Sequence, residues 1–315
     1  MKTTTCVLFV ILLFVPAYAQ DTAPVIDMHL HAGPGSAESE SYTVRNGETP
    51  DEARRRTLLA DMSAHGVVLG IVGGPPVYVE RFRQAAPDRL IGSVTFPCTD
   101  GKSPNLYRCF EDGGDWPDLD MLQTDVEAGR IGALGELINV YAGVSPLDPQ
   151  MEPYYDFAAE HDLIVLTHAE RGPPPEARPP GCCPNFEEEY GAPALYADVL
   201  ERHPNLRLVL YHAFRPEFVE SAIRLMDAYP GVMVETSPMT IVPPPLVHAA
   251  LRRYVEAGHG DRIVFGSDYL GTIGGSLEVI ATAPLSTEQK RAILYENAAR
   301  FLRLSEADMA RHHRE

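Results

Sequence analysis

The sequence has no excess of positive charge. Its 26 lysine and arginine residues stand against 44 aspartate and glutamate residues, which gives a formal net charge of −18 at pH 7. No block of basic residues interrupts this acidic balance. Nucleic acids and anionic lipid surfaces attract proteins that carry clustered positive charge. We therefore expect neither as a partner, and we expect a small-molecule substrate.

Two sequence signatures are also missing. No segment of about 20–50 residues recurs as an internal repeat, which argues against a solenoid. No Gly-x-Gly-x-x-Gly follows the first expected strand, which argues against a dinucleotide-binding fold. The overall composition, with 45% hydrophobic and 22% charged residues, is typical of a soluble globular protein with a large core.

The N-terminus carries an apolar run that is too short to span a bilayer comfortably. Lys2 precedes this run, Val7–Val15, and Ala17-Tyr18-Ala19 follows it as a small-x-small sequence. This order is typical of a cleaved secretory signal. We predict a signal peptide over residues 1–19, a periplasmic or secreted domain over residues 20–315, and no stable membrane association; an uncleaved anchor is the alternative.

Few cysteines are present, and one of the five, Cys6, lies in the predicted signal. An even number in an exported protein permits disulfides. Cys182 and Cys183 are adjacent, so we expect each to bond elsewhere, with Cys98 and Cys109 as candidate partners. Free thiols and a second metal site are the alternatives.

Short apolar segments alternate with longer amphipathic ones along the rest of the chain. Buried parallel strands are expected at Val25–His31, Gly66–Val72, Leu90–Phe96, Ile131–Leu137, Leu163–His168, Leu206–His212, Val232–Thr236 and Arg262–Ser267. Helices are expected at Pro50–Ala64, Val77–Ala86, Pro117–Ala128, Pro153–His161, Glu187–Arg202, Pro216–Ala228, Leu246–Ala257 and Thr287–Leu304. Eight strand–helix units predict a single-domain α/β protein with the (β/α)8 TIM-barrel fold; an open doubly wound sheet is the alternative.

The first expected strand ends in His29-Leu30-His31. Side chains alternate along a strand, so both imidazoles should point into the barrel mouth, where barrel active sites form. Two imidazoles on one face can chelate a single metal ion. Asp27 should share that face one step deeper, in a supporting role.

Three later strands also end in titratable residues, namely His168, His212 and Asp268. A lone histidine after an apolar strand is usually a hydrogen-bonded core residue. Several such groups at neighbouring strand ends each cost free energy unless they are paired or bound to a metal. Their combination therefore indicates a metal site.

Two other strand ends carry carboxylates. Glu136 could orient the substrate, support a ligand or bridge a second ion, and its alternative is a buried ion pair. Glu235 and Ser237 should share one face of the seventh strand, with Thr236 on the other. The sequence does not decide whether these residues only line the site or take part in its function.

These motifs, in this order, resemble the amidohydrolase superfamily, and more narrowly its amidohydrolase-related branch, which includes aminocarboxymuconate-semialdehyde decarboxylase. The closing helix around Ile293–Leu302 is also similar to that branch. The resemblance covers about residues 25–304. It implies that one divalent ion, commonly zinc, is held by His29, His31, His168 and Asp268.

The resemblance further implies that His212 is a catalytic histidine. Two-metal members of the superfamily often carry a carboxylated lysine after the fourth strand, whereas this chain has Glu136 and no lysine nearby. One ion is therefore favoured, and a second ion bridged by Glu136 stays open. Zinc suits imidazole and carboxylate ligands, with manganese, iron and nickel as alternatives.

The leading hypothesis is a hydrolase that acts on an amide, ester or lactone through metal-activated water, whose pKa falls toward about 7. Asp268 would take the proton of the water, and His212 would stabilise the oxyanion. Arg171 and Arg215 could hold a substrate carboxylate, and surface salt bridges are their alternative. Decarboxylation of an unsaturated or aromatic acid and a noncatalytic metal-binding barrel are the competing functions; the chain could also form a homo-oligomer.

Overall fold

The computed structural model describes residues 23–33, 42–97, 114–170, 184–237, 242–269 and 273–314. Several features expected from the sequence lie outside these ranges: the signal peptide, all five cysteines and Arg171. Among the described residues, every helix is too short or too polar to cross a membrane.

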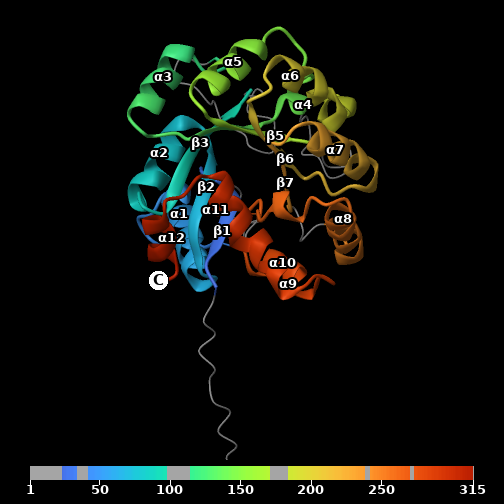
Figure 1. Ribbon diagram of the computed structural model, residues 1–315. Helices are drawn as coiled ribbons and strands as arrows, with labels where there is room; N and C mark the ends of the chain where they lie inside the picture. Colours follow the sequence, from blue (N-terminus) through green and yellow to red (C-terminus); the bar gives the residue numbers. More distant parts are fainter. Residues whose placement is uncertain are drawn as a thin grey trace, which may run out of the picture.

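Eight parallel strands form one sheet in the order β1 to β8, each strand paired with the next along the chain. The strands are β1 (Val25–His31), β2 (Val67–Gly74), β3 (Leu90–Phe96), β4 (Ala133–Leu137), β5 (Ile164–His168), β6 (Arg207–Tyr211), β7 (Val232–Glu235) and β8 (Ile263–Val264). After β8, the Met28 backbone N–H donates to the Phe265 carbonyl at 2.9 Å, which links the last strand to β1. The sheet is thus a nearly closed barrel (Figure 1), which confirms the predicted TIM-barrel fold in one domain.

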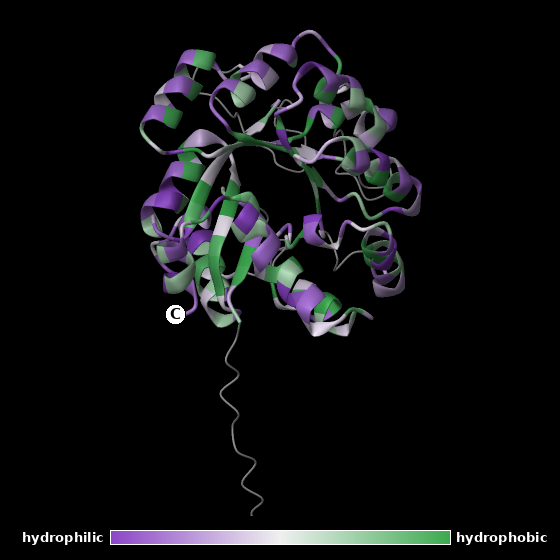
Figure 2. Ribbon diagram, in the orientation of Figure 1, coloured by the Kyte–Doolittle hydropathy of each residue, from purple (hydrophilic) through white to green (hydrophobic). Residues whose placement is uncertain are grey.

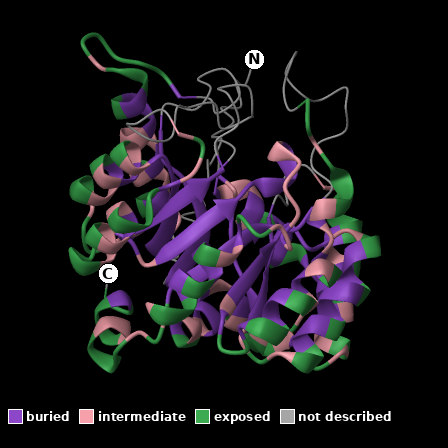
Figure 3. Ribbon diagram, turned by 90° about the horizontal axis from the view of Figure 1, so that it is seen from above, coloured by how far each residue is buried: buried purple, intermediate pink, exposed green. Residues whose placement is uncertain are grey.

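Helices surround the ring of strands (Figure 1). They are α1 (Pro50–Ala64), α2 (Pro76–Ala85), α3 (Leu119–Glu127), α4 (Asn139–Ala142), α5 (Glu152–Glu160), α6 (Tyr196–Arg202), α7 (Pro216–Ala228), α8 (Pro244–Glu256), α9 (Gly274–Thr282), α10 (Thr287–Arg291), α11 (Asn297–Phe301) and α12 (Glu306–His312). The strands are largely hydrophobic and buried, whereas the helices combine hydrophobic, buried positions with hydrophilic, exposed ones (Figures 2 and 3). This pattern is what a barrel covered by one layer of amphipathic helices requires.

Two predicted helices differ from the structure. The segment expected as one helix over residues 187–202 contains two 3-10 turns, Glu188–Gly191 and Pro193–Leu195, before α6 begins. Gly191 approaches the Glu170 carbonyl so closely that a Cβ would collide with it, so glycine is required where the two 3-10 turns meet. The predicted closing helix is instead three consecutive pieces: α10, a π-helical turn at Ala292–Glu296, and α11.

The apolar residues form two main clusters. The larger one lies between the strands and the surrounding helices and includes Leu58, Phe82 and Leu251. The second joins residues of the strands, among them Ile26 and Ile164, to the C-terminal segment of α11 and α12. The strand starts are thus packed against the end of the chain, which leaves the strand ends to form the opposite opening.

Candidate metal and catalytic centre

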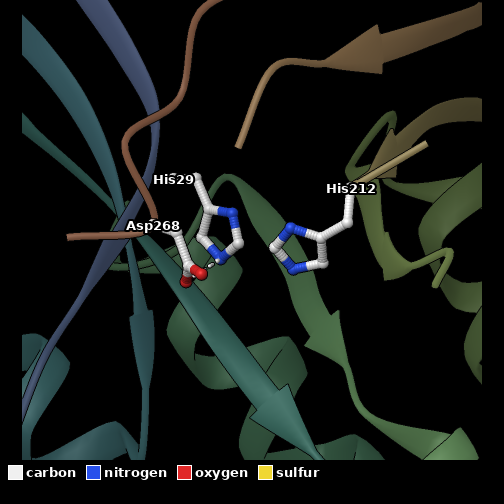
Figure 4. A group of neighbouring side chains, drawn as sticks. All are labelled: His29, His212 and Asp268. Carbon is white, nitrogen blue, oxygen red and sulfur yellow. Dashed lines mark ion pairs between the residues drawn. The ribbon is translucent and has the colours of Figure 1, made fainter. Parts of the chain in front are cut away.

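Six titratable side chains meet at the C-terminal ends of the strands: His29 and His31 on β1, Glu136 on β4, His168 on β5, His212 after β6 and Asp268 after β8. The histidines and Glu136 are buried, and the Asp268 side chain is 13% exposed. All six are candidate site residues in the sequence, and the fold brings them together in overlapping groups of three, in which His168 is joined to His29 and Asp268 through Glu136 and His212. Figure 4 shows that three of them, from distant parts of the chain, point toward one another.

Asp268 reaches both histidines of β1. Its Oδ1 lies 2.8 Å from His31 Nε2 and 3.4 Å from His29 Nε2. The Asp268 backbone has a left-handed conformation, with φ of 60°, and His212 has φ of 63°. Such conformations cost free energy in residues other than glycine and concentrate at functional sites. Each residue is thus held in a specific orientation just after its strand ends.

Glu136 lies between two groups of histidines. Its Oε1 is 2.6 Å from His168 Nδ1 and 3.1 Å from His212 Nε2, and its Oε2 is 3.6 Å from His29 Nε2. Among the described residues, His168 forms a close group with Glu136 and His212, while Glu136 also forms one with His29 and His31. The carboxylate is therefore the central residue of the cluster, a position that the sequence left open.

The residues present fit a divalent metal ion. His29 Nε2 and His168 Nε2 are buried and accept or donate no hydrogen bond among the described side chains. Leaving a buried polar atom without a partner costs about 1–3 kcal/mol. A cation would provide that partner, and imidazole nitrogens with carboxylate oxygens are the donor set that zinc and neighbouring transition metals prefer.

The charges of the cluster shift its pKa values strongly. Burial alone would raise the pKa of Glu136, but the charge of His168 and the hydrogen bonds from His168 and His212 hold it well below its usual range. Asp268 behaves similarly, because His29 and His31 outweigh its burial and lower its pKa. Burial lowers the pKa of His212, yet its hydrogen bond to Glu136 and the charge of Asp268 raise it to about 9. Shifts of this kind are typical of functional sites.

Asp27 supports the first strand from within. Its Oδ1 accepts hydrogen bonds from the backbone N–H groups of His29 and Ser267, both at 3.0 Å. The pairing of β1 with β2 is irregular between Asp27 and Leu30, so the simple alternation assumed from the sequence is interrupted there. Burial raises the pKa of Asp27 to about 7 despite these hydrogen bonds. Its contacts agree with the expected supporting role.

Three residues near the site were missed from the sequence. The Tyr211 ring stacks on His29 at 3.8 Å between ring centroids, and its hydroxyl donates to the Met28 carbonyl. The buried Arg54 of α1 donates to the His31 carbonyl at 2.7 Å. Glu170, two residues after His168, is buried as well. A tyrosine inside a strand and an arginine inside a helix carry no sequence signal of their own.

Arg215, a candidate for holding a substrate carboxylate, forms an ion pair with Glu170 through its Nε. The Arg215 side chain is 37% exposed, so the pair lies at the rim where the segments after β5 and β6 meet. The guanidinium therefore already has a carboxylate partner in this structure. The other candidate, Arg171, is outside the described residues.

The sequence and the fold were compared with protein families and with solved structures. A family model described as "Amidohydrolase" matches residues 26–304. Similar solved structures include a probable 2-pyrone-4,6-dicarboxylic acid hydrolase from Acinetobacter baumannii, at 14% identity and TM-score 0.59, with 89% of this chain and 99% of that chain covered. The 5-carboxyvanillate decarboxylase from Sphingomonas paucimobilis has 16% identity and TM-score 0.57, with 90% and 100% covered.

An uncharacterised TIM-barrel protein from Bordetella bronchiseptica, at 19% identity and TM-score 0.61, covers 89% of this chain and 98% of its own. No curated protein matches this sequence. At these identities the structural neighbours establish the fold, and the family match covers nearly all of the barrel.

Proposed function

This chain belongs to the amidohydrolase family, and we propose that it is a metal-dependent hydrolase that cleaves an amide, ester or lactone bond of a small molecule. The observation that carries the proposal is the buried cluster at the barrel mouth, where two imidazole nitrogens lack hydrogen-bond partners among the described residues. Such a cluster is costly for a purely structural barrel, and a bound cation makes it favourable.

We propose one Zn²⁺ ion, with His29, His31, His168 and Asp268 as its protein ligands. An ion bound there would lower the pKa of a water molecule toward about 7 and polarise a substrate carbonyl. Glu136 contacts His168 and comes near His29, so it would fix the orientation of the ligand rings. Metal analysis that returns two ions for each chain would instead favour a pair bridged by Glu136.

Two residues have roles in proton transfer and charge stabilisation. Asp268, with its lowered pKa, is ionised at neutral pH and can accept a proton from the attacking water before passing it to the leaving group. The His212 imidazole is buried beside Glu136 and can donate a hydrogen bond to the carbonyl oxygen as negative charge develops on it. Both side chains converge on the same space (Figure 4).

A second candidate function is nonhydrolytic decarboxylation of an unsaturated or aromatic carboxylic acid. The specific observation in its favour is the pKa of about 9 for His212, because a protonated imidazole can deliver a proton to the carbon that loses carbon dioxide. Three of the structural neighbours are named as decarboxylases, one of 5-carboxyvanillate and two of 2,6-dihydroxybenzoate. The products separate the two reactions: decarboxylation releases carbon dioxide, whereas hydrolysis adds water across the broken bond.

The proposal is tested with purified protein assayed on lactones, esters and N-acyl compounds, beside a carbon dioxide assay on aromatic acids. His212→Asn should retain bound metal and lower kcat by about 10²–10³-fold, the usual cost of losing one oxyanion donor. His161→Asn, on the outer helix layer, is the matched control and should leave kcat unchanged. Unchanged turnover in His212→Asn would remove this residue from the mechanism, and the absence of bound metal in the native protein would overturn the proposal.

A further inference from the structure

Ser237 contacts both His29, a proposed metal ligand, and His212, the proposed catalytic histidine. It follows β7, is 1% exposed, and its Oγ lies 3.1 Å from His29 Nδ1 and 3.1 Å from His212 Nδ1. The same Oγ donates a hydrogen bond to Glu235 Oε2 at 2.8 Å. One buried hydroxyl thus contacts a proposed metal ligand, the proposed catalytic histidine and a carboxylate.

Glu235 is held in place by the backbone. Its Oε1 accepts the Ser237 N–H at 2.6 Å, and its side chain is fully buried. A Cβ on Gly266 would collide with Glu235 Oε1, so glycine at that position leaves room for the carboxylate. The orientation of the two carboxylate oxygens is therefore fixed, with Oε2 directed at the hydroxyl.

We propose that Glu235 and Ser237 form a positioning pair that keeps hydrogen on the Nδ1 atoms of His29 and His212 and so fixes the Nε2 atoms of both rings toward the site. The inference rests on the proposed function, since it assigns a role to these histidines in a metal-dependent enzyme. A hydroxyl has one hydrogen to donate and two lone pairs that accept. Because Ser237 gives its hydrogen to Glu235 Oε2, both histidines must donate Nδ1–H to Ser237 Oγ.

This arrangement leaves the other nitrogen of each ring for the site. With hydrogen on Nδ1, neutral His29 has a lone pair on Nε2. This atom lies 3.4 Å from Asp268 Oδ1 and makes no hydrogen bond within the part of the chain that the structure describes. His212 Nε2 is also directed to the site, but as a donor: its N–H lies 3.1 Å from the accepting Glu136 Oε1. Partners that fix the tautomer of a ligating histidine also fix the ring orientation, and their loss typically costs about 10–100-fold in metal affinity or activity.

The test uses Glu235→Gln, which keeps the shape and reverses one hydrogen bond. The Gln Oε1 still accepts the Ser237 N–H, so its amide must donate to Ser237 Oγ. The hydroxyl then gives its hydrogen to an imidazole Nδ1. His29 is the ring that should accept it, because its Nδ1 also lies 3.5 Å from the Oε2 position that the new amide takes. This shifts His29 to the Nε2–H form and removes its lone pair from the site. We expect Zn²⁺ affinity, measured by chelator competition, to fall at least about tenfold. We also expect the histidine ring ¹⁵N shifts to show a changed tautomer.

Three further variants separate positioning from general damage. Ser237→Ala should also weaken Zn²⁺ binding, whereas Ser237→Thr, which keeps the hydroxyl, should restore it. Glu220→Gln makes the same chemical change in an exposed pair with Arg253 on the helix layer and should leave Zn²⁺ affinity unchanged. Melting temperatures of the metal-free variants identify any that fail to fold.

The outcomes also distinguish this inference from the proposed function. If His31→Asn weakens Zn²⁺ binding while Glu235→Gln and Ser237→Ala bind it as the native chain does with unchanged ring ¹⁵N shifts, the positioning pair is wrong and the metal site stands. If native protein and His31→Asn bind Zn²⁺ equally, the metal site itself is wrong. Weaker binding in all three variants, with rescue by Ser237→Thr, supports the pair.

Discussion

The two ends of the barrel are built from the same strands and have opposite chemistry. At the strand starts, apolar side chains pack against the C-terminal helices. At the strand ends, four histidines and two carboxylates form overlapping groups of three, and the possible ligand atoms of each group lie within 4.8 Å of one another. Strand β5 shows the contrast by itself: Ile164 begins it, His168 ends it, and both are buried.

The difference lies in what burial does at each end. Removing an apolar side chain such as Ile164 from water contributes about 1.5–3 kcal/mol to stability. Burying a titratable group costs free energy unless a partner compensates, and at the mouth each such group depends on another for that compensation. One end therefore stabilises the fold, and the other maintains a functional arrangement at the expense of stability. Three predictions test this division.

The largest effect is expected for Asp268→Asn. The change keeps the size of the side chain but removes its negative charge and its ability to act as a base, so kcat/KM should fall by about 10²–10⁴-fold. Bound zinc should decrease as well. Kinetic assays and metal analysis measure both; Asp156→Asn, at a side chain that is 70% exposed, is the matched control. Native activity in Asp268→Asn would show that catalysis does not depend on the Asp268 carboxylate.

A change at the other end should do the reverse. Ile164→Ala removes buried apolar volume and should lower the free energy of unfolding by about 2–5 kcal/mol, and Ile164→Val by about 0.5–1.5 kcal/mol. Zn²⁺ affinity should stay within about threefold of the native value. Ile164 and the proposed ligand His168 lie at opposite ends of β5, so the change is far from the metal site. Urea denaturation and chelator competition measure the two quantities. A loss of metal affinity as large as that of Asp268→Asn would show that the two ends are not separable.

The smallest effect concerns pH in the metal-free protein. The pKa of His212 is raised from 6.5 to about 9 in the folded chain, so its contribution to stability is complete below pH 6.5 and is lost as the pH rises through 9. The free energy of unfolding should therefore fall between these pH values by an amount on the order of 2 kcal/mol. Denaturation at both pH values after metal chelation tests this. His212→Asn should show a weaker dependence, and an equal dependence in both proteins would contradict the assignment.

Much of the site could be predicted because barrel geometry converts strand ends into neighbours. Once the strands were identified by their apolar runs, His29, His168 and Asp268 were expected at the same opening even though they are far apart in sequence. The same reasoning selected His212 and Glu136. It needed only strand boundaries accurate to about two residues.

The relations among these residues could not be predicted in the same way. Glu136 is the centre of the cluster, and Ser237 links His29 to His212, because particular rotamers bring their atoms within hydrogen-bond distance. Arg215 was a candidate for the substrate, yet it forms an ion pair with Glu170. Each of these pairings depends on side-chain directions that the positions of residues along a strand do not specify.

The sequence by itself determined the fold class and the residues that gather at the barrel mouth, since alternation and burial act locally along each strand. Only the tertiary structure decided which atom contacts which: Asp268 with His31, Glu136 with His168, and Ser237 with both His29 and His212. The physical reason is that hydrogen bonds depend on distances of a few tenths of an ångström and on angle, and only packing of the whole barrel sets these.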